Sequence, residues 1–351
     1  MATAHKQSGE LKRVAIVVLS AAILVGFSIA YGAYKKVYQT NVSLNEEQIE
    51  LYLPTHSSYD DLLSIIDTSS WLIDHSSFQW VASIKNLKNH IHPGRYIITD
   101  GLSNNDLVNL LRSGNQTPVN ITFQRFFYLS DLAGHLSYRL EPDSISFASY
   151  FTSDSVIAST GLARQTAISL YLPNTYEFYW NTSPQQFVLR MQREYESFWN
   201  EERRLKAEKA GLSEIEVSIL ASIVESETKN IDEMPSVAGL YLNRLKKGMK
   251  LQSDPTVKFA LGDPTKQRIY TNDLKVNSPY NTYLNEGLPP GPILMPSIQS
   301  IESVLNAKDH NYIYMCAKPD YSGYHNFAKT YNQHLSNRKK YQRFLRKEGI
   351  R

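Results

Sequence analysis

The sequence predicts an α+β protein with an N-terminal transmembrane helix, a small α+β subdomain and a larger mixed α+β domain. Three observations support this prediction: an uncharged apolar run near the N-terminus, short strand-then-helix patterns behind it, and one long helical pattern further on. The 351 residues, 42% hydrophobic and 20% charged, suffice for one large or two modest globular domains. The expected boundaries are a tail over 1–13, a membrane helix over 14–34, the subdomain over 37–117 and the main domain over 118–351.

The run from Val14 to Tyr34 contains no charged residue and has two basic residues on each side. About 20 such residues cross a bilayer as a helix. A cleaved signal peptide is the alternative, because Ser28-Ile29-Ala30 resembles a small-residue cleavage site. The run is longer than the usual signal core, which favours an uncleaved anchor. The flanking charges nearly balance and favour a cytoplasmic N-terminal tail only weakly.

Three strand-then-helix patterns follow the apolar run. Each pairs an alternating strand pattern with a polar helix start. The strands are expected at 49–53, 94–98 and 119–127, and the helix starts at Ser58, Ser103 and Ser130. Gly114 is expected to end the second helix. No catalytic cluster lies among these patterns.

The long helical pattern runs from Leu212 to Thr228. Its apolar positions recur at helical spacing, which predicts one buried stripe; they are Leu212, Ile215, Ile219, Leu220, Ile223 and Val224. Ser213 and Glu216 have the spacing of a capping box, which gives the helix a start.

Two glutamates stand near the end of this helix. Glu225 lies above a row of small side chains, Ser218, Ala221 and Ser222, which predicts a shallow groove for a flat ligand. Glu227 points roughly 200° away from Glu225, so one helix cannot bring both acids into one cleft. One glutamate is therefore a candidate acid, and the other is expected to serve structure.

Three loops rich in amide, hydroxyl and proline groups follow the helix, at 251–256, 278–283 and 287–293. Stiff polar loops suit the rim of a cleft for a polar ligand. An earlier aromatic loop at 171–180 fits sugar binding and core packing equally well.

Several chemistries find no support in the sequence. A net charge of +3 is too small to indicate nucleic acid, and the basic C-terminal run reads as a solvated helix end. The nine histidines show no metal-ligand spacing, and neither a nucleophile elbow nor a phosphate loop occurs, so no metal or cofactor is expected. The single cysteine, Cys316, is expected to be inert in a buried strand.

Carboxylate acid–base catalysis remains. Hydrolysis of a glycosidic bond ordinarily needs two carboxylates, and Glu177, Asp254 and Glu286 are loop candidates for a second one. A single acid suffices if the substrate itself supplies the nucleophile.

Four blocks of the sequence resemble the signatures of the YceG-like endolytic murein transglycosylases (murein transglycosylase G). They lie at 221–228, 251–257, 280–283 and 287–293 and read Ala-Ser-Ile-Val-Glu-Ser-Glu-Thr, Leu-Gln-Ser-Asp-Pro-Thr-Val, Tyr-Asn-Thr-Tyr and Gly-Leu-Pro-Pro-Gly-Pro-Ile. The likeness extends to 93–96 and 103–107, and so covers nearly the whole chain after the anchor. It departs from the family pattern at Asn174 and in Gly323-Tyr324-His325-Asn326-Phe327.

The resemblance implies a single-pass protein of the cell inner membrane whose bulk faces the periplasm. The subdomain at 37–117 would be LysM-like, and the domain at 118–351 would be catalytic, with a lysozyme-like catalytic helix. The implied reaction cuts nascent peptidoglycan glycan strands between N-acetylmuramic acid and N-acetylglucosamine. It leaves a 1,6-anhydro end and terminates strand elongation. Peptidoglycan synthases are candidate partners.

The family's catalytic glutamate is matched to Glu225. Ser222, Gln252, Asp254, Asn281 and Tyr283 are the expected substrate-binding residues. Two alternatives stay open: a non-catalytic peptidoglycan-binding scaffold, and a muramidase that hydrolyses the bond with Asp254 as its second carboxylate.

Overall fold

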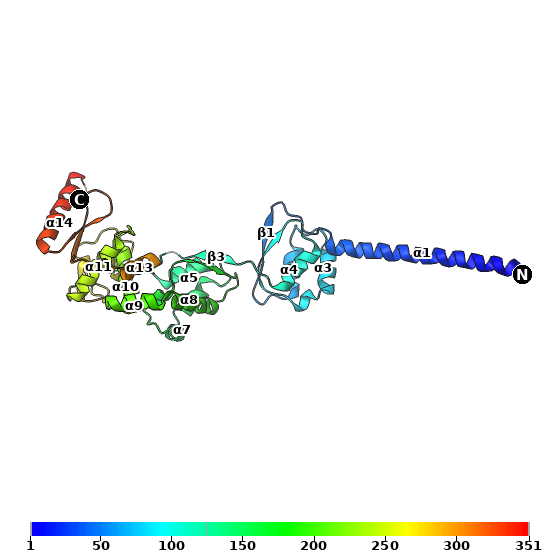
Figure 1. Ribbon diagram of the computed structural model, residues 1–351, viewed down its shortest axis with the longest axis horizontal. Coiled ribbons are helices and arrows are strands. Elements are labelled where there is room, and N and C mark those ends of the chain that lie inside the picture. Colours follow the sequence, from blue (N-terminus) through cyan, green and yellow to red (C-terminus); the bar gives the residue numbers. More distant parts are fainter. Residues whose placement is uncertain (1, 124, 350–351) are drawn as a thin grey trace. The chain divides into compact units, whose positions relative to one another are not determined.

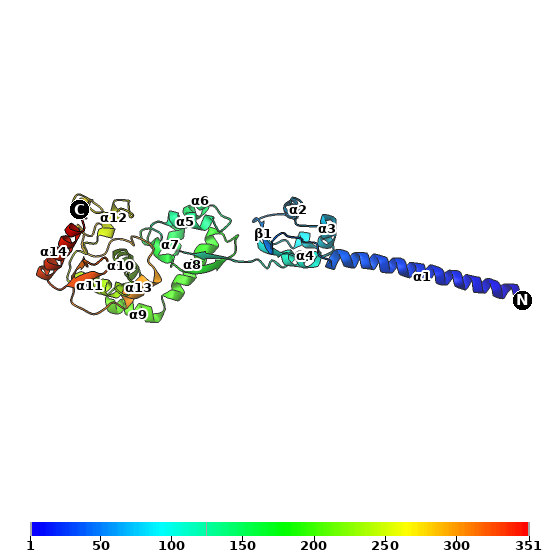
Figure 2. The same ribbon diagram turned by 90° about the horizontal axis from the view of Figure 1, so that it is seen from above.

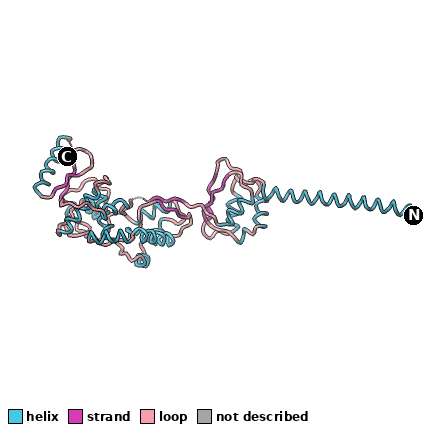
Figure 3. The backbone as a smooth tube through the Cα atoms, viewed as in Figure 1, coloured by secondary structure: helices cyan, strands magenta, loops and turns pink. Residues whose placement is uncertain are grey.

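The computed structural model describes residues 2–123 and 125–349 and divides the chain into two compact units. The first unit is Met1–Val119 with Phe178–Asn181, and the second is Asn120–Glu177 with Thr182–Arg351. The fold is mixed α+β, as predicted, and its strands are few and short among helices and loops (Figure 3).

The N-terminal helix α1 (Ala2–Tyr38) projects from the rest of the first unit as a single helix (Figure 1). Its segment Lys12–Tyr38, 27 residues long, is long and apolar enough to cross a membrane, and its most apolar window has no buried residue. At 1.5 Å per residue this segment spans about 40 Å, more than the hydrocarbon core of a bilayer. The prediction of one apolar N-terminal helix is confirmed.

The rest of the first unit is a two-stranded antiparallel sheet covered by short helices. Its elements are β1 (Gln48–Leu53), α2 (Tyr59–Asp67), α3 (His75–Ile84), a 3₁₀ turn (Leu87–Asn89), β2 (Gly94–Thr99) and α4 (Asn104–Ser113). Leu51 pairs with Tyr96, and both side chains are buried against the helices. The LysM-like interpretation of 37–117 stays a prediction.

Local capping signals begin and end α2 and α4 where the sequence predicts, whereas the third predicted helix begins at Leu129 with Tyr128 as its N-cap, so the predicted start at Ser130 is wrong. Ser58 and Asp61 form a capping box at the start of α2, and Ser103 caps α4. Gly114 ends α4 with φ 68°, a left-handed conformation that glycine adopts without steric cost. The predicted third strand is short, because β3 ends at Thr122, and residue 124 of that range lies outside the described residues.

The second unit is mainly helical. Its elements are β3 (Val119–Thr122), α5 (Leu129–Ser137), α6 (Ser144–Phe151), α7 (Asp154–Ser159), a 3₁₀ turn (Ala167–Leu170), β4 (Thr175–Phe178), α8 (Pro184–Phe198), α9 (Glu201–Ala210), α10 (Glu214–Glu227), α11 (Met234–Lys246), α12 (Asp254–Ala260), a 3₁₀ turn (Asp273–Lys275), α13 (Ile298–Leu305), β5 (Tyr314–Ala317), β6 (His325–Ala328) and α14 (Tyr331–Lys347). The aromatic loop before α8 belongs to the core, since Tyr171, Tyr176 and Phe178 are buried.

Helix α10 is the centre of the second unit, and α11 and α13 pack on it (Figure 2). The predicted capping box of Ser213 and Glu216 starts the helix. All eight residues from Val217 to Val224 are buried, so the middle of the helix is covered on every side instead of along one stripe. Its first turn, from Glu214 to Glu216, and its last turn, from Glu225 to Glu227, are partly or fully exposed.

A C-terminal hairpin completes this unit. Strands β5 and β6 are antiparallel, with Met315 opposite Phe327 and Ala317 opposite His325. Met315 and Phe327 pack against the α10–α11–α13 core. Tyr314, on the other face of the hairpin, stacks on His334 of α14. The register therefore turns Ala317 and His325 toward the core side, where the candidate site lies.

Candidate active site

The two glutamates in the last turn of α10 point in different directions, as their spacing predicts. Glu225 lies at the start of α13. Its Oε2 accepts a hydrogen bond of 2.7 Å from the backbone N–H of Ser297 and one of 2.9 Å from the Ser300 hydroxyl. A carboxylate at a helix N-terminus satisfies free N–H groups and complements the helix dipole. This position gives Glu225 a structural role, which argues against the expectation that it is the acid.

The predicted groove beneath Glu225 does not exist. Ser218, Ala221 and Ser222 are fully buried. The Ser222 hydroxyl accepts a hydrogen bond of 3.1 Å from the backbone N–H of Ile293, so the 287–293 loop covers this face. Helical spacing identifies neighbours on one helix but not the segments that pack on them, which is why this prediction is wrong.

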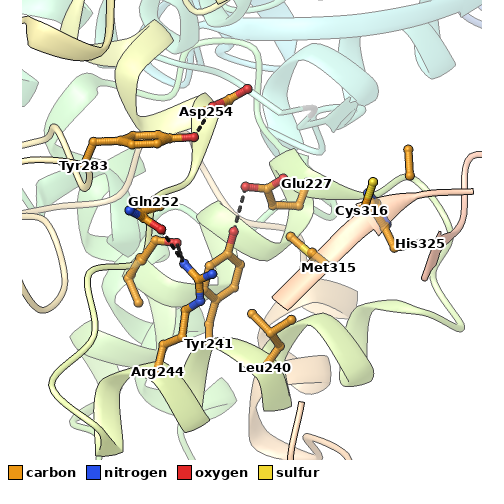
Figure 4. A pocket seen from close by; sticks show the side chains of 12 residues that line it. Glu227, Leu240, Tyr241, Arg244, Gln252, Asp254, Tyr283, Met315, Cys316 and His325 are labelled. Carbon is orange, nitrogen blue, oxygen red and sulfur yellow. Dashed lines mark hydrogen bonds between the residues drawn. The ribbon is translucent and has the colours of Figure 1, made fainter. Parts of the chain in front are cut away.

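Glu227 instead lines a cavity of about 240 Å³ (Figure 4). Five segments of the second unit form its wall: the end of α10, the helix α11, the turn into α12, the loop that carries Tyr283 and the C-terminal hairpin. The polar side chains of this wall include Glu227, Tyr241, Arg244, Gln252, Asp254, Tyr283 and His325. Titratable groups that converge on one concave surface are typical of a catalytic site.

The carboxyl group of Glu227 is held from one side only. Its Oε1 accepts hydrogen bonds from the Tyr241 hydroxyl, at 2.7 Å, and from the Ser253 hydroxyl. Burial raises the pKa of the Glu227 carboxyl above its ordinary value, and these two hydrogen bonds offset only part of the rise. The negative charge of Asp254 raises the pKa further. Such a carboxyl keeps its proton to higher pH, as a general acid requires.

Three of the predicted substrate-binding residues lie at this cavity: Gln252, Asp254 and Tyr283. The Tyr283 hydroxyl donates a hydrogen bond of 2.6 Å to Asp254 Oδ1. Gln252 has φ 52°, a left-handed conformation that costs a non-glycine residue free energy. Backbone strain of this kind is common where a side chain must face a ligand.

The other two predicted residues, Ser222 and Asn281, are buried away from it. Asn281 donates hydrogen bonds to the backbone carbonyls of Leu274 and Val276, and its Oδ1 accepts one from the N–H of Tyr283. Asn281 therefore shapes the loop that carries Tyr283. The loop candidates Glu177 and Glu286 are exposed and do not line the cavity.

Among the wall residues that sequence reasoning did not assign to the site are Tyr241, Arg244, Cys316 and His325. Tyr241 and Arg244 lie three residues apart on α11 and reach the cavity from one helix face. Arg244 is 7% exposed and donates to the backbone carbonyls of Leu251 and Ile313. Cys316 is only partly buried and lines the cavity, so the prediction that it lies buried is wrong, and His325 lines the cavity from β6.

Comparison with known proteins agrees with this architecture. A family model described as the YceG-like family matches residues 51–340. The endolytic murein transglycosylase of Bacillus subtilis (strain 168) is 25% identical over 337 residues, which cover 91% of each chain. The endolytic murein transglycosylase of Streptococcus pneumoniae serotype 2 is 35% identical over 106 residues, 29% of this chain and 19% of the pneumococcal one.

Among solved structures, a yceG-like protein from Listeria monocytogenes has a similar fold. The TM-score is 0.55 at 25% sequence identity, and the match covers 83% of this chain and 98% of the Listeria chain. The resemblance that the sequence motifs indicate is thereby confirmed. Since the family model extends from the first strand into the C-terminal helix, this chain belongs to the YceG-like family.

Proposed function

We propose that this protein is an endolytic murein transglycosylase that cuts peptidoglycan glycan strands with Glu227 as its acid. Two proteins that bear the name endolytic murein transglycosylase are its relatives, one of them along nearly the whole chain. The observation that carries the assignment is the partly buried Glu227 carboxyl, which has a raised pKa and lines a polar cavity.

The reaction needs one group that first gives and later regains a proton. Protonated Glu227 donates to the oxygen between N-acetylmuramic acid and N-acetylglucosamine. The C6 hydroxyl of the muramic acid attacks C1, the bond from C1 to the leaving oxygen breaks, and a 1,6-anhydro end forms. The proton of the C6 hydroxyl restores Glu227, so no water is consumed.

Gln252, Asp254 and Tyr283 are the proposed substrate contacts beside the acid, because all three line its cavity. An amide side chain can pair with the acetamido group of either sugar. The Asp254 carboxylate, held by Tyr283, would favour the positive charge that develops on the sugar ring in the transition state.

We further infer that α1 anchors the chain once in the inner membrane, with the second unit in the periplasm. The length and apolar surface of Lys12–Tyr38 support the anchor. A periplasmic position would bring the cavity to newly made strands, whose elongation the cut would end.

The test compares two equivalent changes on one helix. Glu227→Gln and Glu225→Gln each replace a carboxylate by an amide of the same shape, in full-length protein kept in detergent. The proteins act on purified glycan strands, and mass spectrometry counts new 1,6-anhydro ends. We expect Glu227→Gln to lower the rate at least about 100-fold and Glu225→Gln to keep the activity of its folded fraction.

The proposal fails if Glu227→Gln still releases anhydro ends at the wild-type rate. It also fails if Glu225→Gln alone abolishes them while the protein stays folded, since Glu225 would then be the acid. A wild-type protein that binds strands without cutting them would indicate a scaffold.

The second candidate function is hydrolysis, favoured by one observation: Asp254 lines the same cavity as Glu227. A muramidase with these two carboxylates would leave reducing muramic acid ends instead of anhydro ends. The same mass spectra separate the two products, because the hydrolysed end is heavier by one water.

A further inference from the structure

Another carboxylate, that of Glu233, contacts a histidine that lines the cavity. Glu233 immediately precedes α11 and is 5% exposed. Its Oε1 accepts a hydrogen bond of 2.7 Å from the backbone N–H of His325, and its Oε2 lies 2.8 Å from Nδ1 of the same residue. One carboxylate thus fixes both the main chain and the ring of His325, which itself lines the cavity beside Glu227.

This contact determines the tautomer of the ring. An ionised carboxylate only accepts hydrogen bonds, so Nδ1 of His325 carries a hydrogen and donates it. In neutral imidazole the other nitrogen, Nε2, is then an acceptor. Within residues 2–123 and 125–349, no hydrogen bond joins this Nε2 to another group. It is also not among the buried polar atoms that lack a partner in this part of the chain. Its lone pair is free for a ligand.

We propose that Glu233 and His325 form a carboxylate–imidazole pair whose Nε2 accepts the hydrogen of the attacking C6 hydroxyl of the glycan. His325 lines the same cavity as the acid, with Glu233 behind it, and the hairpin register turns His325 toward the core side. This inference rests on the proposed function and adds a base that accepts the hydrogen of the attacking hydroxyl. Glu227 cannot fill this role while it still holds its own proton.

The proton balance closes with this arrangement. The C6 oxygen forms its bond to C1 as the C1–O bond to the leaving sugar breaks and the leaving oxygen takes the proton of Glu227. The C6 proton passes to Nε2 of His325, and the imidazolium is stabilised by the carboxylate of Glu233. Transfer of that proton to the Glu227 carboxylate returns both groups to their starting states.

A neighbouring pair supplies the control for a purely structural role. The hydroxyl of Tyr324 donates to Asp232, with distances of 2.9 and 3.0 Å to its two oxygens. Tyr324–Asp232 and Glu233–His325 tie the same two chain segments together, but neither Tyr324 nor Asp232 lines the cavity. Tyr324→Phe therefore removes a tether of the hairpin without touching the site.

The decisive variant is Glu233→Gln. Its amide keeps the size of the side chain and still accepts from the N–H of His325. Its NH₂ group, however, donates to Nδ1 and forces the hydrogen onto Nε2, which turns the acceptor at the cavity into a donor. In full-length protein acting on purified glycan strands, we expect Glu233→Gln and His325→Ala to lower kcat at least about tenfold. Their KM should stay within about twofold of the wild type, and Tyr324→Phe should leave kcat unchanged.

Three results would contradict the proposed role of the pair. They are a wild-type kcat in folded Glu233→Gln, a rise in the KM of Glu233→Gln without a loss of kcat, or an equal loss of kcat in Tyr324→Phe. Thermal unfolding of each variant shows that the fraction assayed is folded. If the wild type forms anhydro ends and Glu233→Gln matches it, only this inference fails and the proposed function stands.

A second measurement does not depend on turnover. Histidine ¹⁵N resonances of the Glu227→Gln variant, assigned with His325→Ala in the same background, report the protonation of each ring nitrogen. We expect an Nδ1–H tautomer for His325, and a shift of its Nε2 resonance when glycan strands are added. An Nε2–H tautomer, or no shift at saturating strands, would contradict the proposal even if the chain proved inactive.

Discussion

The hydroxyl group of Tyr241 donates a hydrogen bond of 2.7 Å to Oε1 of Glu227 from the neighbouring helix. Ser253 donates to the same oxygen, and in the described part of the chain no group donates to Oε2. The carboxyl is thereby oriented by one oxygen, while the other is free to carry the proton that the reaction uses. This division matches what a general acid needs: a fixed orientation and an open proton site.

The Tyr241 contact predicts a shift in the pH profile. A donor stabilises the ionised carboxylate, so this hydrogen bond lowers the pKa of Glu227 against the larger effect of burial. Tyr241→Phe removes the donor and should raise the pKa, so the protonated acid should persist to higher pH. We expect the alkaline limb of anhydro-end formation to move upward, by about one pH unit at most.

Ser253→Ala provides the matched change on the same oxygen and should shift the limb in the same direction. A limb that stays in place in both variants, or moves to lower pH, would show that Glu227 does not control the rate.

The raised pKa of Glu227 predicts that the free energy of unfolding falls as the pH rises. Burial raises the pKa of its carboxyl above the ordinary value of 4.5 that it has in the unfolded chain. The stabilisation from its neutral form is complete below that value and is lost as pH rises toward the folded-state pKa. Each unit between the two pKa values corresponds to about 1.4 kcal/mol.

Glu227→Gln carries no ionisable group at this position, so it should escape that loss. We expect the variant to match the wild type near pH 4 and to exceed its unfolding free energy at pH 7, as urea titrations at both pH values would show. A difference that is the same at both pH values would contradict a raised pKa. An inactive but more stable variant would fit the general conflict between stability and activity at catalytic sites.

Glu225 should behave differently, because its carboxylate binds the start of α13. Glu225→Gln weakens the hydrogen bonds from Ser297 and Ser300 and removes a charge that favours the helix N-terminus. We expect a loss of about 1 kcal/mol in unfolding free energy, measured by urea titration at pH 7, with kcat unchanged. Ser300→Ala should cause a comparable loss, and a stable Glu225→Gln protein without activity would refute this structural assignment.

The helix ends were predictable because their signals are local. The caps at Ser58, Ser103 and Ser213 depend on residues three apart in sequence, which any helix brings together. Helix α3 went unpredicted, since its buried stripe is limited to Ser77, Phe78, Val81 and Ala82.

The choice between the two glutamates shows where such signals end. Their angular separation on α10 follows from helix geometry and correctly predicts that they diverge. Which of them meets the cavity depends on Tyr241, Ser253 and the hairpin residue His325, all of which come later in the chain. A resemblance of short motifs could not settle this, because both glutamates lie in the same motif.

Two substitutions of Gln252 should separate the effect of its strained backbone on stability from the effect of its side chain on substrate binding. Its φ of 52° lies in the left-handed region, where alanine is strained and glycine is not. Gln252→Gly and Gln252→Ala both remove the amide at the cavity, so both should raise KM for glycan strands by a similar factor. Only the alanine variant keeps a Cβ in the unfavourable conformation, so it should be less stable than the glycine variant by about 1 kcal/mol. Urea titrations and initial rates on the same preparations measure both effects. If the two variants differed in KM as they do in stability, the backbone conformation of Gln252, and not its side chain, would be what the substrate requires.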